Sequence, residues 1–137
     1  MCLAQKGPKR KGEAAELAFM LKAVSLGFGV AKPWGDSERY DFILDTGTQL
    51  SRVQVKSTSS MRRGAYCVSA HCNTKGNLIA YRIGEIDFLV AQIVPEDCWY
   101  VIPLEAILPH MSLPIYPEKD PRKGRYRKYH EAWELIR

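Results

Sequence analysis

An acid, an amide and a lysine stand at spacings that allow them to meet on one face of a β-sheet. Asp41 opens a short apolar segment, and Gln54 and Lys56 lie two residues apart in the next one. Side chains two positions apart in a strand point to the same side. If the two segments pair as an antiparallel hairpin, the carboxylate of Asp41 lies across from Gln54 and Lys56.

These side chains supply the groups needed to hydrolyse a phosphodiester bond with a divalent cation. Mg²⁺ prefers oxygen ligands, which are available from the side chains of Asp41 and Gln54 and from the carbonyl of Val55. A lysine such as Lys56 orients the attacking water or stabilises charge on the phosphate. Glu16 adds an acid from the predicted N-terminal helix, on the stripe that the helix is expected to bury.

The elements that position this group begin with a helix. Apolar residues recur at helical spacing, which predicts that one face is buried; they are Leu17, Met20, Leu21 and Val24. Gly27 is suited to end the helix. A short strand is expected over Gly29–Trp34, before the hairpin of Tyr40–Leu44 with Leu50–Ser57.

Later segments predict further strands and a closing helix. A strand over Ala65–His71 is followed by a stretch over Leu78–Ile86 that is either helical or irregular. Asp87–Val94 and Cys98–Ile102 are strongly apolar and read as a hairpin. The last helix is expected over Tyr129–Arg137. This order predicts an α/β protein with a mixed central sheet flanked by helices, in one domain over 1–137 whose residues 1–10 form a basic leader.

The composition of the chain limits the kinds of molecule that it is expected to bind. The chain has 137 residues and a net charge of +5, with a pI near 9.1, which favours polyanions. No apolar run is long enough to span a membrane, and the N-terminus is basic where a signal peptide is apolar. We therefore expect a soluble, cytoplasmic protein with no membrane partner. The four cysteines form no C-x-x-C pair, which disfavours zinc and leads us to assign no disulfide.

Three short motifs give a family resemblance over about residues 9–60. Lys11 to Glu16 matches a K-G-x-x-x-E opening, Tyr40-Asp41 stands in place of P-D, and Gln54-Val55-Lys56 stands in place of (D/E)-x-K. In these motifs the chain resembles the PD-(D/E)XK nucleases, in particular their archaeal Holliday-junction resolvase-like and intron-encoded members. The resemblance implies a restriction-endonuclease-like core and a metal-dependent endodeoxyribonuclease that uses Mg²⁺, or Mn²⁺ as a substitute.

The resemblance also assigns roles and leaves alternatives open. It implies that Glu16, Asp41, Gln54 and Lys56 form the catalytic group, with Lys56 at the water or phosphate and Glu16 assisting the metal or a second site. Gln54 replaces an acid, so one negative charge is missing from the metal site. One alternative is a catalytically inactive nucleic-acid-binding module of the same fold, and another is a structural or interaction domain whose basic clusters serve only solubility. Junctions, homing sites, restriction sites and damaged DNA all remain possible substrates, and RNA is not excluded.

DNA binding by this chain requires basic groups outside the catalytic set. The candidates are Lys9, Arg10, Lys11, Arg62, Arg63, Arg122, Lys123, Arg125, Arg127 and Lys128. Tyr126 and Tyr129 interleave the last cluster, either to stack on bases or to pack the final helix, and Trp34 and Trp133 have the same two roles open to them. One site per chain and two DNA strands to cut predict a homodimer or a higher homo-oligomer.

Overall fold

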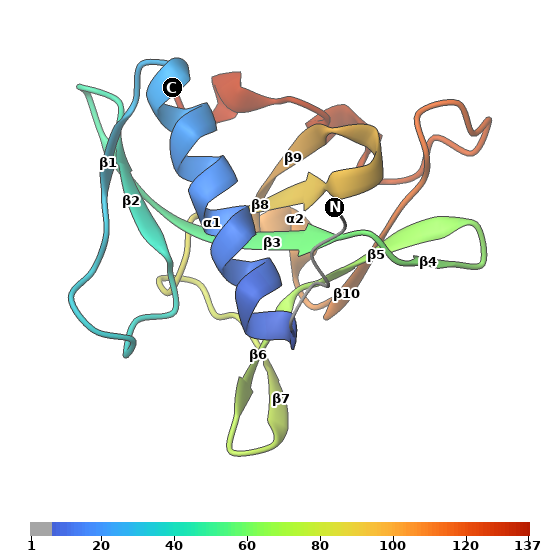
Figure 1. The fold of residues 1–137 in the computed structure, drawn as a ribbon, viewed down its shortest axis with the longest axis horizontal. Coiled ribbons are helices and arrows are strands. Elements are labelled where there is room, and N and C mark those ends of the chain that lie inside the picture. The colour runs from blue at the N-terminus through green and yellow to red at the C-terminus, as the bar shows by residue number, and fades with distance from the viewer. Residues whose placement is uncertain (1–6) are drawn as a thin grey trace, which may run out of the picture.

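The computed structural model describes residues 7–137, and its centre is a five-stranded sheet crossed by one long helix (Figure 1). The helices are α1 (Gly7–Ser25) and α2 (Leu104–Ile107). The strands are β1 (Gly29–Ala31), β2 (Phe42–Asp45), β3 (Leu50–Thr58), β4 (Met61–Arg62), β5 (Ala65–Ser69), β6 (His71–Thr74), β7 (Asn77–Ala80), β8 (Phe88–Ile93), β9 (Cys98–Pro103) and β10 (Ser112–Ile115). Of the expected leader, residues 1–6 lie outside the described residues, and residues 7–10 are helical.

The central sheet is mixed, as expected. Its strand order is β1-β2-β3-β8-β9, and only the β3–β8 pair is parallel. The expected hairpins β2–β3 and β8–β9 are both confirmed. The parallel neighbours β3 and β8 are joined by a long connection that carries β4 to β7, because parallel strands cannot be joined by a tight turn.

The face of α1 that packs on the sheet differs from the prediction. Ala15, Phe19 and Ala23 are buried, whereas Leu17 and Leu21 are 63% and 73% exposed. Both sets recur at helical spacing, so periodicity alone does not choose between them. The alanines let the helix approach the sheet closely, and the Phe19 ring fills the space against Phe42, 5.2 Å away, and two tryptophans.

The C-terminal segment was expected to be a helix, and this is wrong. It consists of two short 3-10 turns, Arg127–Tyr129 and Trp133–Leu135, separated by Glu131 with a positive φ of 50°. The Glu131 carboxylate accepts hydrogen bonds from the main-chain N–H of Trp99 and the indole N–H of Trp133. These contacts to β9 stabilise an irregular backbone in place of helical hydrogen bonds. Trp133 is buried, in agreement with its packing role.

The second face of the sheet is covered by elements that the sequence indicated only in part. The expected strand Ala65–His71 is broken at Ala70 into β5 and β6, which belong to different small sheets. β5 pairs with β10, a strand that was not predicted because it contains Pro114 within a proline-rich stretch. The uncertain stretch over Leu78–Ile86 begins as β7, which forms a hairpin with β6 (Figure 1).

No helix in the described part of the chain is long and apolar enough to cross a membrane.

Candidate active site

The β2–β3 hairpin brings the predicted residues together. Phe42 pairs with Val53, so Asp41 extends the same register by one residue. The main-chain N–H of Asp41 donates to the carbonyl of Val53 at 2.8 Å, and the N–H of Val55 donates to Asp41 Oδ2 at 2.8 Å. Alternate residues of β3 are buried against α1, which leaves Gln54 and Lys56 together on the opposite face.

The carboxylate of Asp41 lies in poorly solvated surroundings. Burial raises its pKa above the ordinary value, and the N–H of Val55 opposes this effect. The negative charge of Glu16 raises the pKa further, whereas Lys56 lowers it. Within the described residues only Oδ2 accepts a hydrogen bond, so Oδ1 remains available to another partner.

The ammonium group of Lys56 is held at the same place by two groups from the connection between β3 and β8. Its Nζ donates to the carbonyl of His71 at 3.2 Å and lies 5.8 Å from the ring centre of Tyr81. Burial lowers the pKa of Lys56, and the nearby charge of Asp41 opposes the shift. These contacts fix the lysine beside Asp41, where a cationic donor faces the space in front of the carboxylate.

His71 and Tyr81 complete the group, and the sequence did not indicate them as parts of this site. The hydroxyl of Tyr81 donates to the His71 carbonyl at 3.4 Å. The His71 ring contacts Ser69 Oγ through Nε2 at 3.1 Å, while its buried Nδ1 has no partner among the described residues. The β6–β7 hairpin pairs His71 with Ala80 and so places His71 next to Tyr81. No local sequence pattern predicts that these two residues contact Lys56.

A cavity of about 350 Å³ opens in front of these side chains. Asp41, Gln54 and Lys56 line one wall of this cavity from the β2–β3 hairpin, and His71 and Tyr81 line the other. Arg39 also lines the cavity, and its Nε lies 3.7 Å from Glu85 Oε1. Such a concave polar site with an acid and a base of shifted pKa is typical of an active centre.

The oxygen atoms present fit a hard divalent cation better than zinc. The side-chain amide nitrogen of Gln54 donates to the Val55 carbonyl oxygen at 3.5 Å, so the amide group and this carbonyl are neighbours on β3. Together with Asp41 they form an all-oxygen group of the kind that Mg²⁺ prefers. The described residues contain no cluster of three or more acidic, histidine or cysteine side chains. Two carboxylates line the cavity, those of Asp41 and Glu38, and Asp41 is the one placed beside Gln54 by the register of the β2–β3 hairpin.

Glu16 lies at the border of the group. Its carboxylate is 2.9 Å from Lys32 Nζ, which extends from the segment after β1. The charge of Glu16 is felt at Asp41, whose pKa it raises. Glu16 occupies this place because it flanks the buried Ala15, Phe19 and Ala23 stripe rather than the stripe that the sequence predicted.

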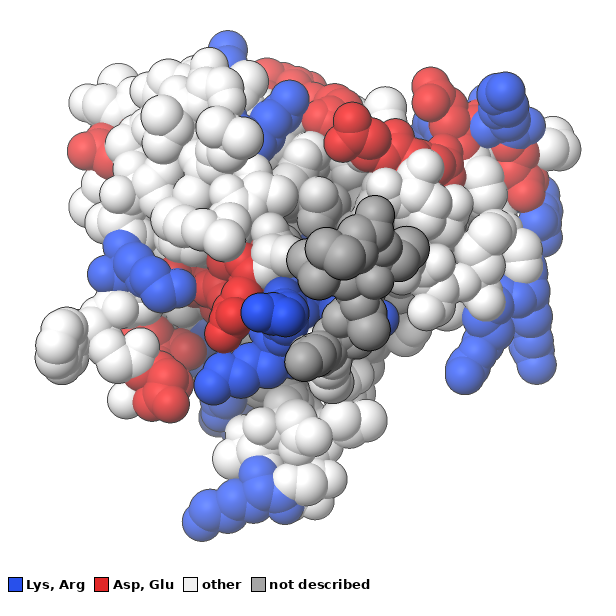
Figure 2. All heavy atoms as spheres, in the orientation of Figure 1, with Lys and Arg blue, Asp and Glu red and all other residues white. Residues whose placement is uncertain are grey.

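The predicted DNA contacts form two exposed regions. Lys9, Arg10 and Lys11 are in the first turns of α1, and blue side chains lie below this end of the helix in Figure 2. A second group lies at the β4–β5 hairpin, where Arg122 packs over Gly64: an added Cβ on this glycine would be 2.5 Å from Arg122 Nη2. Acidic side chains gather mainly along the upper right edge of the same view.

The structure corrects one predicted contact and leaves the others as proposals. Tyr126 is buried with 3% exposure, so it cannot stack on a base. Tyr129 packs partly against the core, and Trp34 is fully exposed. Several basic side chains of the last cluster have partners, such as Asp120, which accepts hydrogen bonds from Arg122 at 2.7 and 3.0 Å.

Comparisons with known proteins agree with this geometry. A family model described as PD-(D/E)XK endonuclease matches residues 6–136. Among solved structures, the chain is similar to the bacterial homing endonuclease I-Ssp6803I, with 33% sequence identity and a TM-score of 0.81. The match covers 96% of this chain and 92% of that chain. A comparison with curated protein sequences gave no match. The restriction-endonuclease-like core is confirmed, and the chain belongs to the PD-(D/E)XK endonuclease family.

Proposed function

We propose that this protein is a homing-type endonuclease that hydrolyses phosphodiester bonds of DNA with Mg²⁺, or with Mn²⁺ in its place. The observation that carries the proposal is the convergence of Asp41, Gln54 and Lys56 in one cavity of a PD-(D/E)XK chain. Nucleases of this family generally use divalent metals. The homing-type assignment rests on the similarity to a bacterial homing endonuclease along almost the whole chain.

Asp41, Gln54 and the carbonyl of Val55 would hold the metal, and Glu16 would support the site through its charge. A bound divalent cation lowers the pKa of a water molecule and neutralises negative charge on the phosphate. The shifted pKa of Asp41 supports this assignment, because a cation relieves the cost of a buried carboxylate.

Lys56 would orient the attacking water or stabilise the negative charge of the phosphate during hydrolysis. The water oxygen attacks phosphorus and releases one proton to solvent, the bond from phosphorus to the leaving oxygen of the sugar breaks, and that oxygen takes up one proton from solvent. The His71 carbonyl and the Tyr81 ring restrict the lysine to this position before DNA binds. Such preorganisation reduces the reorganisation that the reaction requires.

Cleavage of both strands would require two copies of the chain, because each copy has one such cavity with Asp41 and Lys56. The simplest arrangement is a homodimer with a two-fold axis. Light scattering coupled to size exclusion, with and without DNA, measures the number of copies. A particle that stays monomeric on DNA contradicts this part of the proposal.

The deciding experiment is cleavage of supercoiled plasmid, of a synthetic duplex library and of a four-way junction in Mg²⁺ and in Mn²⁺. Lys56→Ala and Asp41→Ala should abolish cutting, because each removes a group from the cavity. Lys119→Ala is the matched control, since Lys119 is exposed and lies away from the cavity. A duplex cut at one sequence supports the homing-type assignment, whereas a preference for the junction contradicts it.

Thermal unfolding in rising Mg²⁺ separates an active site from an inactive binding module. A ligand that binds only the folded state raises Tm with its concentration. We expect Mg²⁺ and Mn²⁺ to raise the Tm of the parent protein but not that of Asp41→Ala. An unchanged parental Tm together with salt-sensitive DNA binding contradicts the nuclease proposal and identifies the inactive module.

A further inference from the structure

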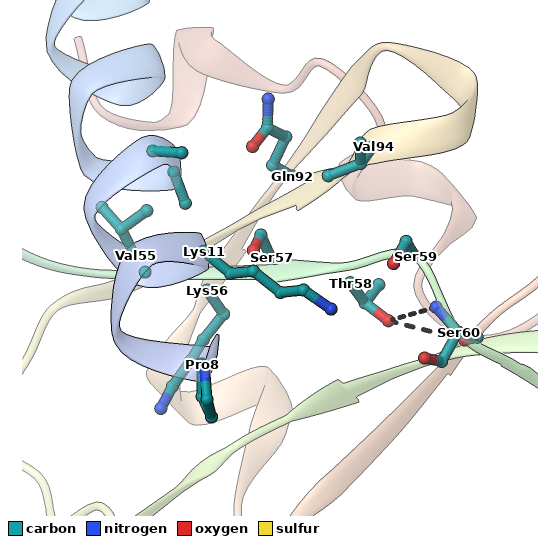
Figure 3. Close-up of a pocket in the computed structure, with 13 residues that line it drawn as sticks. Pro8, Lys11, Val55, Lys56, Ser57, Thr58, Ser59, Ser60, Gln92 and Val94 are labelled. Carbon is teal, nitrogen blue, oxygen red and sulfur yellow. Dashed lines mark hydrogen bonds between the residues drawn. The ribbon is translucent and has the colours of Figure 1, made fainter. Parts of the chain in front are cut away.

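A second and larger cavity lies between α1 and the end of β3 (Figure 3). Its volume is about 610 Å³. The first turns of α1 form one wall, and the chain from Val55 to Ser60 forms the other. Lys11 extends from α1 toward the end of β3 in Figure 3, so its ammonium group stands over the cavity.

The lining of this cavity is suited to an anion. Among the described residues it includes Lys11 and no acidic residue. Lys56 also lines it, but the ammonium group of this lysine is held by the His71 carbonyl in the smaller cavity. Four consecutive hydroxyl residues follow Lys56 in the chain: Ser57, Thr58, Ser59 and Ser60. Thr58 Oγ1 is engaged with the main chain of Ser60. The other three hydroxyls and the Lys11 ammonium group make no hydrogen bond to the described residues.

Gly12 is a further indication that another molecule comes close to the helix backbone in this cavity. It lies within α1, where glycine is less favourable than alanine. Its φ is ordinary, and beyond the backbone of α1 itself an added Cβ would meet no atom of the described residues within 4 Å. Neither the backbone conformation nor packing within residues 7–137 therefore requires a glycine there. A residue without a side chain leaves room for another molecule to reach the helix backbone.

The two cavities adjoin at β3. Lys56 lines both of them, and the chain from Val55 to Ser57 runs between them. We propose that the larger cavity binds the DNA phosphate next to the one that is cut, through Lys11 and the free serine hydroxyls after Lys56. This inference rests on the proposed nuclease function and adds a binding site for a neighbouring nucleotide to it.

The first test measures binding of a fluorescent DNA duplex by anisotropy, in chelator so that no cutting occurs, at several salt concentrations. Lys11→Ala should weaken binding about three- to tenfold and reduce the slope of log K against log salt by about one, because one phosphate contact is lost. Lys119→Ala removes the same charge from an exposed place outside both cavities and should change neither quantity.

Gly12→Ala separates a ligand contact from a structural role. The added methyl group meets no side chain of residues 7–137 and favours the helix, so Tm should be unchanged or higher. DNA affinity should nevertheless fall severalfold, because the methyl group occupies space that the phosphate needs. A fall in affinity that follows a fall in Tm contradicts the proposal.

The second test identifies the phosphate on a duplex whose cut has been mapped. A neutral methylphosphonate placed on one side of the cut should weaken binding of the parent. The same replacement should not weaken DNA binding by Lys11→Ala any further, because this variant already lacks the lysine that contacts the phosphate. If every position weakens both proteins equally, Lys11 does not contact the neighbouring phosphate and the proposal is overturned.

These outcomes also separate the two proposals. A parent that binds and cuts DNA, with Lys11→Ala and Gly12→Ala both within twofold of Lys119→Ala in affinity, overturns the neighbouring-phosphate site alone. A parent that neither binds nor cuts DNA overturns the nuclease function and the site together.

Discussion

The carboxylate of Asp41 and the amide of Gln54 share one face of the β2–β3 hairpin, and only one of them is charged. The pKa of Asp41 is already raised by burial and, to a lesser degree, by the charge of Glu16. A second acid on β3 would add another negative charge in the same place. Gln54 therefore keeps the metal-free site more stable, at the expense of weaker binding of a cation.

Gln54→Glu should have opposite effects without and with metal. In chelator, we expect Tm to fall below that of the parent, because two carboxylates then repel each other. In Mg²⁺, the variant should gain more Tm than the parent and reach half of its gain at a lower metal concentration. Gln54→Ala, which removes an oxygen and adds no charge, should gain less than the parent. Equal gains for all three proteins would show that position 54 does not bind the metal.

Much of the candidate site was predictable at this scale because it is local in sequence. Asp41, Gln54 and Lys56 belong to one hairpin, so strand alternation and register place them together. His71 begins β6 and Tyr81 follows directly after β7, and their contacts with Lys56 depend on tertiary structure that no short pattern encodes.

Among the elements, α1 shows why a helical pattern needs the rest of the fold for its interpretation. Leu17, Leu21 and Val24 repeat at helical spacing and are all at least 60% exposed, whereas the buried stripe is Ala15, Phe19 and Ala23. Large apolar residues therefore occur on both faces. The sheet selects the face whose small residues allow close packing around a single large ring.

Substitutions on the two faces of α1 should differ sharply. Phe19→Ala should lower the free energy of unfolding by about 3–5 kcal/mol, because it leaves a cavity between the rings of Phe42, Trp99 and Trp133. Leu21→Ala should change it by less than about 0.5 kcal/mol, since its side chain is already in solvent. Urea denaturation measures both values. Similar losses for the two variants would show that the Leu21 face is covered in solution.

The ion pair between Asp87 and Arg52 links the start of β8 to β3. Its contribution to the free energy of unfolding is expected to depend on pH. Asp87 accepts hydrogen bonds from the Arg52 main chain at 2.7 Å and from its guanidinium at 3.1 Å. Partial burial raises the pKa of Asp87, but these bonds outweigh it and hold the pKa below the ordinary 3.8. The stabilisation is therefore present above pH 3.8 and is lost as the pH falls through the lower pKa of the folded state.

The measurement is the difference in unfolding free energy between the parent and Asp87→Asn. We expect the parent to be the more stable of the two near neutral pH, with a difference that shrinks as the pH falls below 3.8. A difference that is constant over this range would mean that the carboxylate charge contributes nothing to the tie between β3 and β8.

Over the whole molecule, charge is distributed unevenly around a net value of +5. Basic side chains lie at the N-terminal end of α1 and at the β4–β5 hairpin, and many acidic ones lie along the upper right edge of the view (Figure 2). If about six of the basic groups contact phosphates, log K for DNA should fall with log salt at a slope of about −5. Anisotropy titrations measure this slope. A slope near zero would contradict DNA binding through these surfaces.

The sequence predicted the mixed central sheet and its two hairpins, because these depend on apolar alternation and turn residues. It did not predict β10 or the irregular C-terminus. Pro114 argued against β10, and the C-terminal segment takes its conformation from the contacts of Glu131 with Trp99 and Trp133. Where a partner far along the chain sets the backbone, local propensity gives the wrong element.

The parallel pairing of β3 with β8 affects when the protein can complete its fold during synthesis of the chain. Glu16, Asp41, Gln54 and Lys56 all precede residue 60, but β8 and β9 follow after the long connection. Closing that connection costs chain entropy before the parallel contacts form. A nascent chain that has been made only as far as β7 therefore contains all four residues without the core strand beside them. Competence to cut DNA should arise only once β8 and β9 have been synthesised.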